Sequence, residues 1–309
     1  MPLTPIAQAM LAQFNANPVD WKSITPIQFR ESSRAMEQPA DPADRILSTD
    51  ADADGVPVRI YRREEAGAAE EPVLVFYHGG GYIACGISSH ERLCHRLARL
   101  AECAIVSVDY RLAPEHVFPA AVDDALTALR WVAAHGAGRG LDTRRIAIGG
   151  DSAGGSLATV AALRARDEGG PALVHQLLFY PATDLTGTTE SERLYADGYF
   201  LDSDFSEMCV SSYIPEPGDR AHPWVSPLLA EDLSRLPPAT VITAECDPLR
   251  DEGRAYAERL NASGVPARYT DYAGVFHGFA SMFGMLPEGD EALAQGAAAL
   301  REAFARIDA

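Results

Sequence analysis

Short apolar runs alternate with helical stretches along most of the chain. The runs expected to be strands cover residues 73–77, 104–108, 145–148, 174–179, 240–244 and 265–269. The stretches with helical spacing, including one that closes the chain, cover residues 89–101, 119–135, 153–167, 249–262 and 290–307. Strands that alternate with helices predict an α/β fold, in which helices flank both faces of a mostly parallel sheet. A hairpin with strands at 45–48 and 56–62, turning at Asp54-Gly55, is expected before this alternation begins.

Two segments, residues 1–44 and 184–225, do not follow the alternation. They divide the chain into four parts: 1–44, 45–183, 184–225 and 226–309. In the first, Leu3, Ile6, Met10 and Phe14 recur at helical spacing and predict a short amphipathic helix. The insertion at 184–225 is rich in aromatic residues. Such an insertion after a core strand is either a lid over a pocket or a surface excursion with its own small core.

Composition excludes several classes of protein. The 309 residues are 47% hydrophobic, which suffices for one large α/β domain. A net charge of -18 is expected to repel nucleic acid and anionic membranes. The five cysteines are odd in number and form no CxxC pair, which argues against a disulfide scaffold or a zinc site and favours reduced thiols in a cytoplasmic enzyme. We expect no signal peptide, and no run of about 18 apolar residues predicts a membrane span.

The strongest local motif is Gly150-Asp151-Ser152-Ala153-Gly154, which lies between an apolar strand and a helical pattern. A G-x-S-x-G sequence in this position is typical of the nucleophile elbow, a tight turn that exposes a serine hydroxyl above a sheet. The small neighbours let the strand and the helix approach each other. The motif is short, and a tight turn without chemistry is the alternative.

A second motif, His78-Gly79-Gly80-Gly81, directly follows the 73–77 run. Acyl transfer needs hydrogen-bond donors aimed at the oxyanion of the tetrahedral intermediate. The N–H groups of Gly80, Gly81 and Ala153 are the candidate donors. The alternatives are a plain connecting loop or a phosphate cradle, but neither GxGxxG nor GxxxxGK[ST] occurs.

A serine nucleophile needs a base, and in such hydrolases the order along the chain is serine, acid, histidine. Three histidines follow Ser152: His175, inside an expected core strand; His222, in the insertion; and His277, in a loop after the last expected strand. Order and position favour His277 as the base.

The acid is expected in the loop after the 240–244 strand. Asp247 is the first candidate beyond the strand, Glu245 is held in reserve as a supporting residue, and Asp251 fits the first turn of the next helix, where a carboxylate offsets the dipole. Asp247 is therefore our choice.

Together, these motifs resemble those of the hormone-sensitive-lipase-like family of bacterial esterases over most of residues 45–285. The matching stretches are His78-Gly-Gly-Gly81, Asp109-Tyr-Arg-Leu-Ala-Pro-Glu115, Gly150-Asp-Ser-Ala-Gly-Gly155, Asp247-Pro-Leu-Arg-Asp-Glu-Gly253 and His277-Gly-Phe279. The resemblance implies an α/β-hydrolase fold with a helical cap, which is built from the N-terminal segment and the 184–225 insertion. Cys246 departs from the family, where an aromatic residue is common.

The resemblance also implies a function. It assigns a triad of Ser152, Asp247 and His277, with oxyanion donors Gly80, Gly81 and Ala153, and no metal or organic cofactor. Short- to medium-chain carboxylic esters are the implied substrates, and a homodimer is compatible with the family. Arg111 is expected to pair with carboxylates without a direct catalytic role. The alternatives are a lipase, an amidase or a non-catalytic binding protein on the same fold, but the binding proteins lose the histidine that this chain keeps.

Overall fold

The computed structural model of the protein describes residues 3–34 and 39–306. Residues 1–2 and 35–38 of the segment predicted at 1–44 lie outside the described residues. So do residues 307–309 of the segment predicted at 226–309, which include the expected end of the last helix at residue 307.

One sheet of eight strands forms the centre of the described chain, in the order β1-β2-β4-β3-β5-β6-β7-β8. The β1–β2 and β2–β4 pairs are antiparallel, whereas all other neighbours are parallel. The strands are β1 (Ile46–Ala53), β2 (Val56–Arg63), β3 (Glu71–Tyr77), β4 (Ala104–Val108), β5 (Leu141–Asp151), β6 (His175–Phe179), β7 (Ala239–Cys246) and β8 (Ala267–Phe276). The predicted α/β-hydrolase fold, with its mostly parallel sheet, is confirmed.

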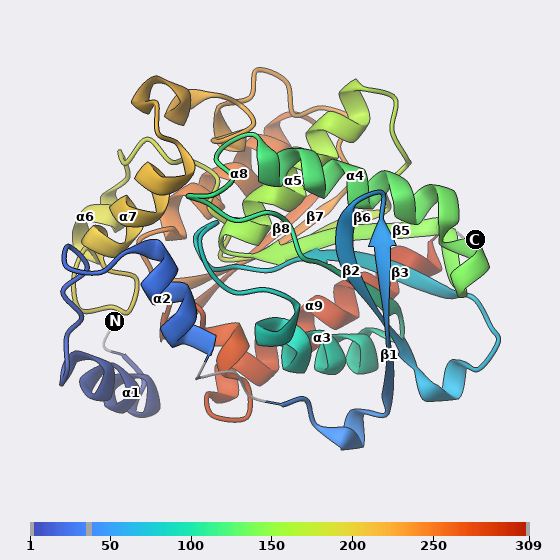
Figure 1. Ribbon diagram of the computed structural model, residues 1–309, viewed down its shortest axis with the longest axis horizontal. Coiled ribbons are helices and arrows are strands. Elements are labelled where there is room, and N and C mark those ends of the chain that lie inside the picture. Colours follow the sequence, from blue (N-terminus) through green and yellow to red (C-terminus); the bar gives the residue numbers. More distant parts are fainter. Residues whose placement is uncertain (1–2, 35–38, 307–309) are drawn as a thin grey trace.

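Helices cover both faces of this sheet (Figure 1). They are α1 (Pro5–Asn15), α2 (Pro26–Ser33), α3 (Ile87–Ala101), α4 (Ala120–His135), α5 (Ala153–Asp167), α6 (Glu190–Leu194), α7 (Ser203–Tyr213), α8 (Arg250–Ala262) and α9 (Pro287–Ala305). Helices α3 and α9 pack together on one face, and α4, α5 and α8 lie on the other.

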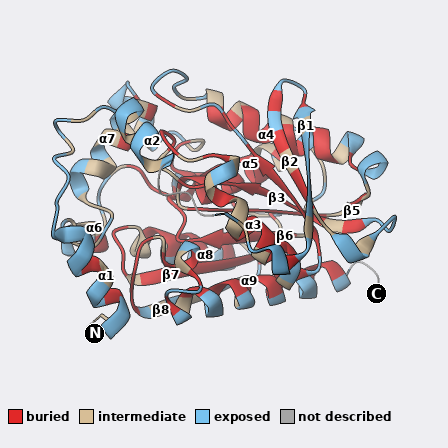
Figure 2. Cartoon of the chain, turned by 60° about the horizontal axis from the view of Figure 1, so that its bottom comes forward, coloured by how far each residue is buried: buried red, intermediate tan, exposed pale blue. Residues whose placement is uncertain are grey.

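Strand β3 shows why the central strands contain continuous apolar runs. Val73 and Val75 contribute to the core under α4 and α5, whereas Leu74 and Phe76 contribute to the core under α3 and α9. Successive side chains of a strand point to opposite faces, so a strand covered on both faces must be apolar at every position. All residues of β4 and β6 are accordingly buried, as are residues 73–77 of β3 (Figure 2).

The structure differs from the sequence-based expectation in several elements. Strands β1 and β5 are longer than the strands expected at 45–48 and 145–148. Strand β8 runs to Phe276, well past the expected end at residue 269. Helix α2 was not expected at all, although Thr25 and Gln28 form a capping box around Pro26 at its start. This helix buries no residue of its own, and the apolar periodicity on which the prediction relied is therefore absent.

The N-terminal segment and the 184–225 insertion pack against each other. Trp21 and Phe29 from the N-terminal segment contact Phe205 of α7, with ring centroids 4.6 and 4.9 Å apart. The Trp21 indole N–H also donates to Asp202, at 3.4 Å. Helices α1, α2, α6 and α7 therefore gather at one end of the molecule, although residues 45–183 separate the two segments along the chain.

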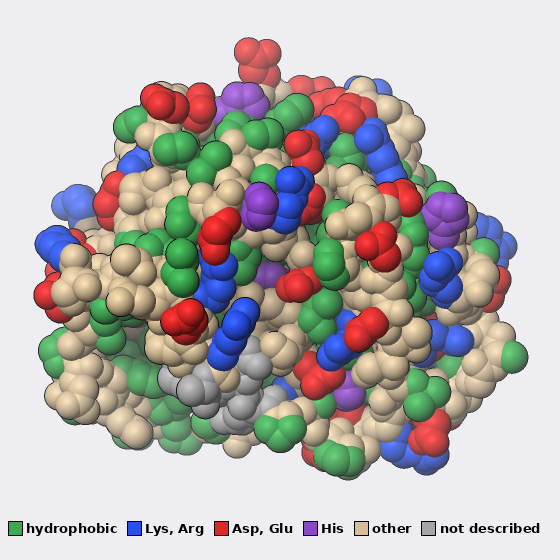
Figure 3. All heavy atoms as spheres, viewed as in Figure 1, with side chains coloured by type: hydrophobic (Ala, Val, Ile, Leu, Met, Phe, Trp, Pro, Cys, Tyr) green, Lys and Arg blue, Asp and Glu red, His purple; other side chains and the backbone are tan. Residues whose placement is uncertain are grey.

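The surface carries acidic and basic side chains side by side (Figure 3). Many of these charges form ion pairs, such as Arg268 with Glu302 at 2.6 Å. Among the described residues, no helix has the length and apolar character needed to cross a bilayer.

Candidate active site

Ser152 occupies the tight turn between β5 and α5. Its backbone has φ 53° and ψ −123°, a strained conformation for a residue other than glycine. Such strain persists only where the surroundings hold it, and the Ser152 N–H donates to the Phe179 carbonyl at 2.9 Å. A Cβ on Gly154 would overlap the Tyr77 carbonyl oxygen, so the helix reaches β3 only because this residue is glycine. The Ser152 side chain therefore stands beyond the carboxyl end of β5 with part of its surface exposed.

The loop after β3 brings Gly80 and Gly81 to the same end of the sheet. Both have positive φ values, 111° and 60°. A Cβ on Gly81 would overlap the Cys209 sulfur of α7, so a side chain at this position is excluded. In the described part of the chain, the N–H groups of Gly80 and Gly81 donate to no other residue. Two backbone donors without a protein acceptor are available to a ligand.

A buried carboxylate holds this loop from behind. Asp151 Oδ1 accepts a hydrogen bond from the Gly79 N–H at 2.9 Å and lies 3.1 Å from His90 Nε2 of α3. Burial alone would raise the pKa of Asp151, but His90 and the Gly79 N–H outweigh it and lower the pKa below its usual range. Sequence reasoning missed His90, which is 61 positions away from Asp151 along the chain and belongs to no motif used for the prediction.

His78, the first residue of the glycine motif, is a structural residue. Burial lowers its pKa to about 3, so the ring is neutral near pH 7. The ring stacks on Tyr110 with centroids 4.2 Å apart, and its Nδ1 lies 2.7 Å from the Gly79 carbonyl oxygen. The Tyr110 hydroxyl donates to the His78 carbonyl at 2.7 Å, which links the loop to the Asp109–Glu115 motif.

Two charged residues of that motif, Arg111 and Glu115, form ion pairs. Arg111 pairs with Asp124 of α4 at 2.7 Å, in line with its expected carboxylate partner. Glu115 pairs with Arg30 of α2 at 2.9 Å. Arg30 also donates to the Ile83 carbonyl at 2.7 Å and thereby ties α2 to the segment that follows the glycine loop.

Asp247 and His277 complete a line of hydrogen bonds that ends at Ser152. Asp247 follows β7, is fully buried, and accepts from the Leu249 N–H at 2.8 Å through Oδ1. Its Oδ2 lies 2.7 Å from His277 Nδ1, and His277 Nε2 lies 2.9 Å from the Ser152 Oγ. His277 follows β8, so all three side chains come from the carboxyl ends of parallel strands, where open α/β sheets bind their ligands.

The other two candidates for the acid, Glu245 and Asp251, are hydrogen-bonded to residues other than His277. Glu245 still belongs to β7 and accepts from the Gly274 N–H at 2.8 Å, so it braces the strand that leads to His277. Asp251 lies in the first turn of α8 and accepts from the Ser191 N–H at 2.9 Å.

The two other histidines that follow Ser152 in the sequence take no part in the Asp247–His277–Ser152 hydrogen bonds. His175 begins β6, and its Nε2 lies 3.0 Å from the Thr240 hydroxyl. His222 is exposed and accepts from the Trp224 N–H at 3.0 Å.

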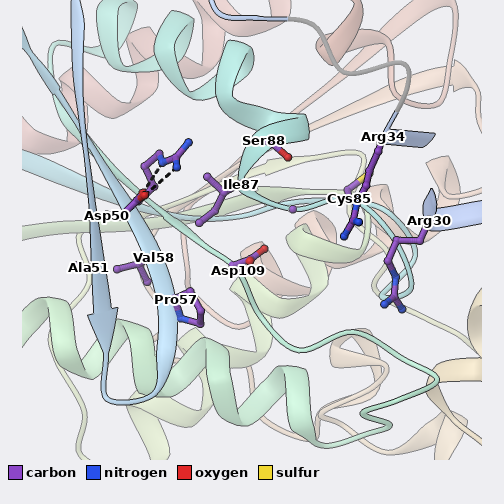
Figure 4. Close-up of a pocket in the computed structure, with 12 residues that line it drawn as sticks. Arg30, Arg34, Asp50, Ala51, Pro57, Val58, Cys85, Ile87, Ser88 and Asp109 are labelled. Carbon is purple, nitrogen blue, oxygen red and sulfur yellow. Dashed lines mark hydrogen bonds and ion pairs between the residues drawn. The ribbon is translucent and has the colours of Figure 1, made fainter. Parts of the chain in front are cut away.

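A cavity of about 400 Å³ lies between the β1–β2 hairpin, α2 and the start of α3 (Figure 4). Its lining includes Arg34, Cys85 and Asp109, but none of the six residues predicted for the site. Among the described residues, no cluster of three His, Cys, Asp or Glu side chains could hold a metal ion.

The fold and the geometry define a class of protein, and comparison with known proteins agrees. A family model described as the alpha/beta hydrolase fold matches residues 74–281, and the chain belongs to this family. Carboxylesterase NlhH of Mycobacterium tuberculosis is 39% identical, over 98% of this chain and 96% of its own. Ethyl acetate hydrolase of Pseudomonas putida is 40% identical, over 89% of this chain and 88% of its own.

A solved structure is similar throughout. The hyperthermophilic esterase from the archaeon Pyrobaculum calidifontis matches with a TM-score of 0.91 and 41% identity, over 98% of this chain and 99% of its own. The resemblance to hormone-sensitive-lipase-like esterases, predicted from the motifs, is confirmed.

Proposed function

We propose that Ser152, His277 and Asp247 are the nucleophile, base and orienting acid of this ester-hydrolysing serine hydrolase, a carboxylesterase. The observation that carries the proposal is the pair of hydrogen bonds at 2.7 and 2.9 Å that connects the three side chains. A serine hydroxyl is a weak nucleophile near neutral pH, and a positioned base is what activates it.

In the first half of the reaction, His277 Nε2 takes the hydroxyl proton while Ser152 Oγ attacks the ester carbonyl carbon. The carbonyl oxygen becomes an oxyanion, which the N–H groups of Gly80, Gly81 and Ala153 stabilise. The start of α5 adds the positive end of a helix dipole. The tetrahedral intermediate then collapses, the bond to the alcohol oxygen breaks, and His277 Nε2 returns its proton to the leaving alcohol.

In the second half, water attacks the acyl-enzyme. His277 takes a proton from the water, the same donors hold the second oxyanion, and the proton passes to Ser152 Oγ as the carboxylic acid leaves. Asp247 keeps Nδ1 protonated, so that Nε2 faces the serine, and stabilises the imidazolium in both halves.

The substrates we propose are short- to medium-chain carboxylic esters. Helices α1, α2, α6 and α7 would cover the site as a cap, supported by the contacts of Trp21 and Phe29 with Phe205. We also propose a homodimer and a cytoplasmic location. The location is supported by Cys94, Cys103, Cys209 and Cys246, which are buried thiols without a disulfide.

Covalent labelling tests the proposal directly. A fluorophosphonate should modify one serine stoichiometrically, abolish esterase activity at the same rate, and be found by peptide mass spectrometry on Ser152. The Ser152→Ala variant should take up no label. Full labelling of that variant, or a label on another residue that accompanies inactivation, would overturn the assignment.

A further inference from the structure

Three phenylalanines from separate parts of the chain form one aromatic cluster. Phe14 lies in the last turn of α1, Phe200 lies in the 184–225 insertion, and Phe276 ends β8. The ring centroids are 5.1 Å apart for Phe14–Phe200, 5.7 Å for Phe200–Phe276 and 6.4 Å for Phe14–Phe276. These separations are typical of favourable aromatic pairs. The cluster therefore joins the N-terminal segment, the insertion and the core at one point.

That point is next to the proposed base. Phe276 immediately precedes His277, and the Phe200 ring lies over Gly278, which immediately follows it. A Cβ on Gly278 would stand 3.5 Å from the Phe200 ring. The proposed oxyanion loop, residues 79–81, is bordered by a different side chain, since Cys209 packs against Gly81. The cluster thus flanks the backbone of His277, on the side of the base.

Exposure within the cluster is uneven. Phe276 is fully buried, whereas Phe14 and Phe200 are 42% and 40% exposed. Exposed aromatic surface beside a reactive group is available to contact a bound ligand. Phe276 therefore acts as the anchor, and the other two rings present aromatic surface to solvent.

Phe200 is also held in an unusual backbone conformation. Its φ is 77°, which is a rare value for a bulky residue and persists only where the surroundings impose it. Neighbouring contacts do so here: the Asn15 side chain donates to the Gly198 carbonyl at 2.9 Å, and the Gly198 N–H donates to Asp202 at 3.0 Å. The ring is thus fixed over Gly278 at the expense of backbone strain.

We infer that Phe14 and Phe200 form a subsite for the alcohol part of the ester and favour aromatic alcohols. This inference rests on the proposed function, in which His277 Nε2 protonates the leaving alcohol. The alcohol oxygen then lies beside His277, and its substituent meets the two exposed rings. A benzyl group stacks on or packs edge-on to such rings, whereas an ethyl group covers little of them.

The test compares esters that share an acyl group. Benzyl acetate and ethyl acetate both release an ordinary alcohol, so the ratio of their kcat/KM values reports contacts to the alcohol part. Phe200→Ala should lower the benzyl-to-ethyl ratio by about tenfold, the effect of one or two lost aromatic contacts. Phe14→Ala should lower the ratio in the same direction, and Phe200→Tyr should restore it. The preference between ethyl acetate and ethyl butyrate, which differ in the acyl part, should not change.

Leu194→Ala is the matched control, since Leu194 is an apolar residue of the same insertion and is 56% exposed. The benzyl-to-ethyl ratio of the Leu194→Ala variant should equal that of the wild type. An unchanged ratio in both phenylalanine variants, or an equal fall for every ester, would overturn the subsite. Phe200→Tyr and Phe14→Ala keep the test decisive if Phe200→Ala does not fold. Failure of the proposed function is distinguishable, because Ser152→Ala would then still hydrolyse both acetates.

Discussion

The two ends of the parallel strands use the same residue type in opposite ways. At the carboxyl end, His277 lies between a buried carboxylate and the Ser152 hydroxyl, so each ring nitrogen has a partner that suits proton transfer. At the amino end, His175 begins β6, and within the described residues its ring hydrogen-bonds the Thr240 hydroxyl alone. It lines a cavity of about 400 Å³ together with Pro238 and Pro266.

The two ends also differ in their backbone donors and in the environment of their histidine. The carboxyl end of the sheet carries a strained serine and two glycine N–H groups without a protein acceptor in the described chain. At the amino end, burial lowers the pKa of His175 to about 4 and keeps the ring neutral. Partners and position in the sheet therefore distinguish the proposed base, His277, from the neutral His175.

The sharpest test of this contrast is removal of the proposed nucleophile. Ser152→Ala should lower kcat by at least about 10⁴-fold, because the oxyanion donors alone supply only a small part of the rate enhancement. Steady-state hydrolysis of a short-chain ester measures the loss. Ser156→Ala, one turn later on α5, is the control and should retain turnover. A Ser152→Ala enzyme with wild-type kcat would contradict the assignment of catalysis to the carboxyl end of the parallel strands.

The next effect separates two of the three carboxylates of the 247–253 motif, Asp247 and Asp251. Asp247→Asn should lower kcat by roughly 10⁴-fold, because an amide favours the wrong imidazole tautomer and cannot stabilise the imidazolium. Asp251→Asn should leave kcat near the wild-type value, since Asp251 bonds the Ser191 N–H and two arginines. Equal losses in the two variants would contradict the choice of Asp247.

A smaller effect is expected from the support behind the oxyanion loop. His90→Ala removes the partner of Asp151, so Gly79 and the two glycines after it are held less firmly. We expect kcat/KM to fall by about 10- to 100-fold, less than the loss of one oxyanion donor, with the change mainly in kcat. His90→Gln keeps a donor and should recover part of the rate.

His95→Ala is the matched control for this variant. His95 is buried on the same helix and packs against Tyr61 instead of Asp151. If His95→Ala lowers kcat as much as His90→Ala does, the effect of His90 is a general loss of packing in α3.

The residues changed in these variants differ in how far the sequence alone predicts their role. Strand β3 and the elbow at Ser152 were predictable because their patterns are local: a continuous apolar run and a glycine-flanked serine before a helix. His90 was not, because its role depends on where α3 packs against the end of β5. Helix α2 was missed because it is stabilised by contacts such as Arg30 with Ile83 and Glu115, which leave no apolar period in the sequence.

The aromatic cluster escaped prediction for the same reason. The sequence showed that the insertion is aromatic, but the pairing of Phe200 with Phe14 and Phe276 depends on how three distant segments meet. Such contacts become visible only in the folded chain.

The last prediction concerns the amino end and should leave catalysis unchanged. A histidine with a folded pKa of about 4 and an ordinary unfolded pKa of 6.5 takes up its proton first in the unfolded state. The free energy of unfolding is therefore highest above pH 6.5 and falls as the pH drops toward 4. For His175 the full loss is about 3 kcal/mol, and His78 adds a fall of the same sign. His175→Gln should flatten this slope in urea unfolding at pH 7, 5.5 and 4.5, while kcat at pH 7 stays at the wild-type value. A slope that is unchanged by the substitution would mean that His175 accepts a proton in the folded protein as easily as in the unfolded chain.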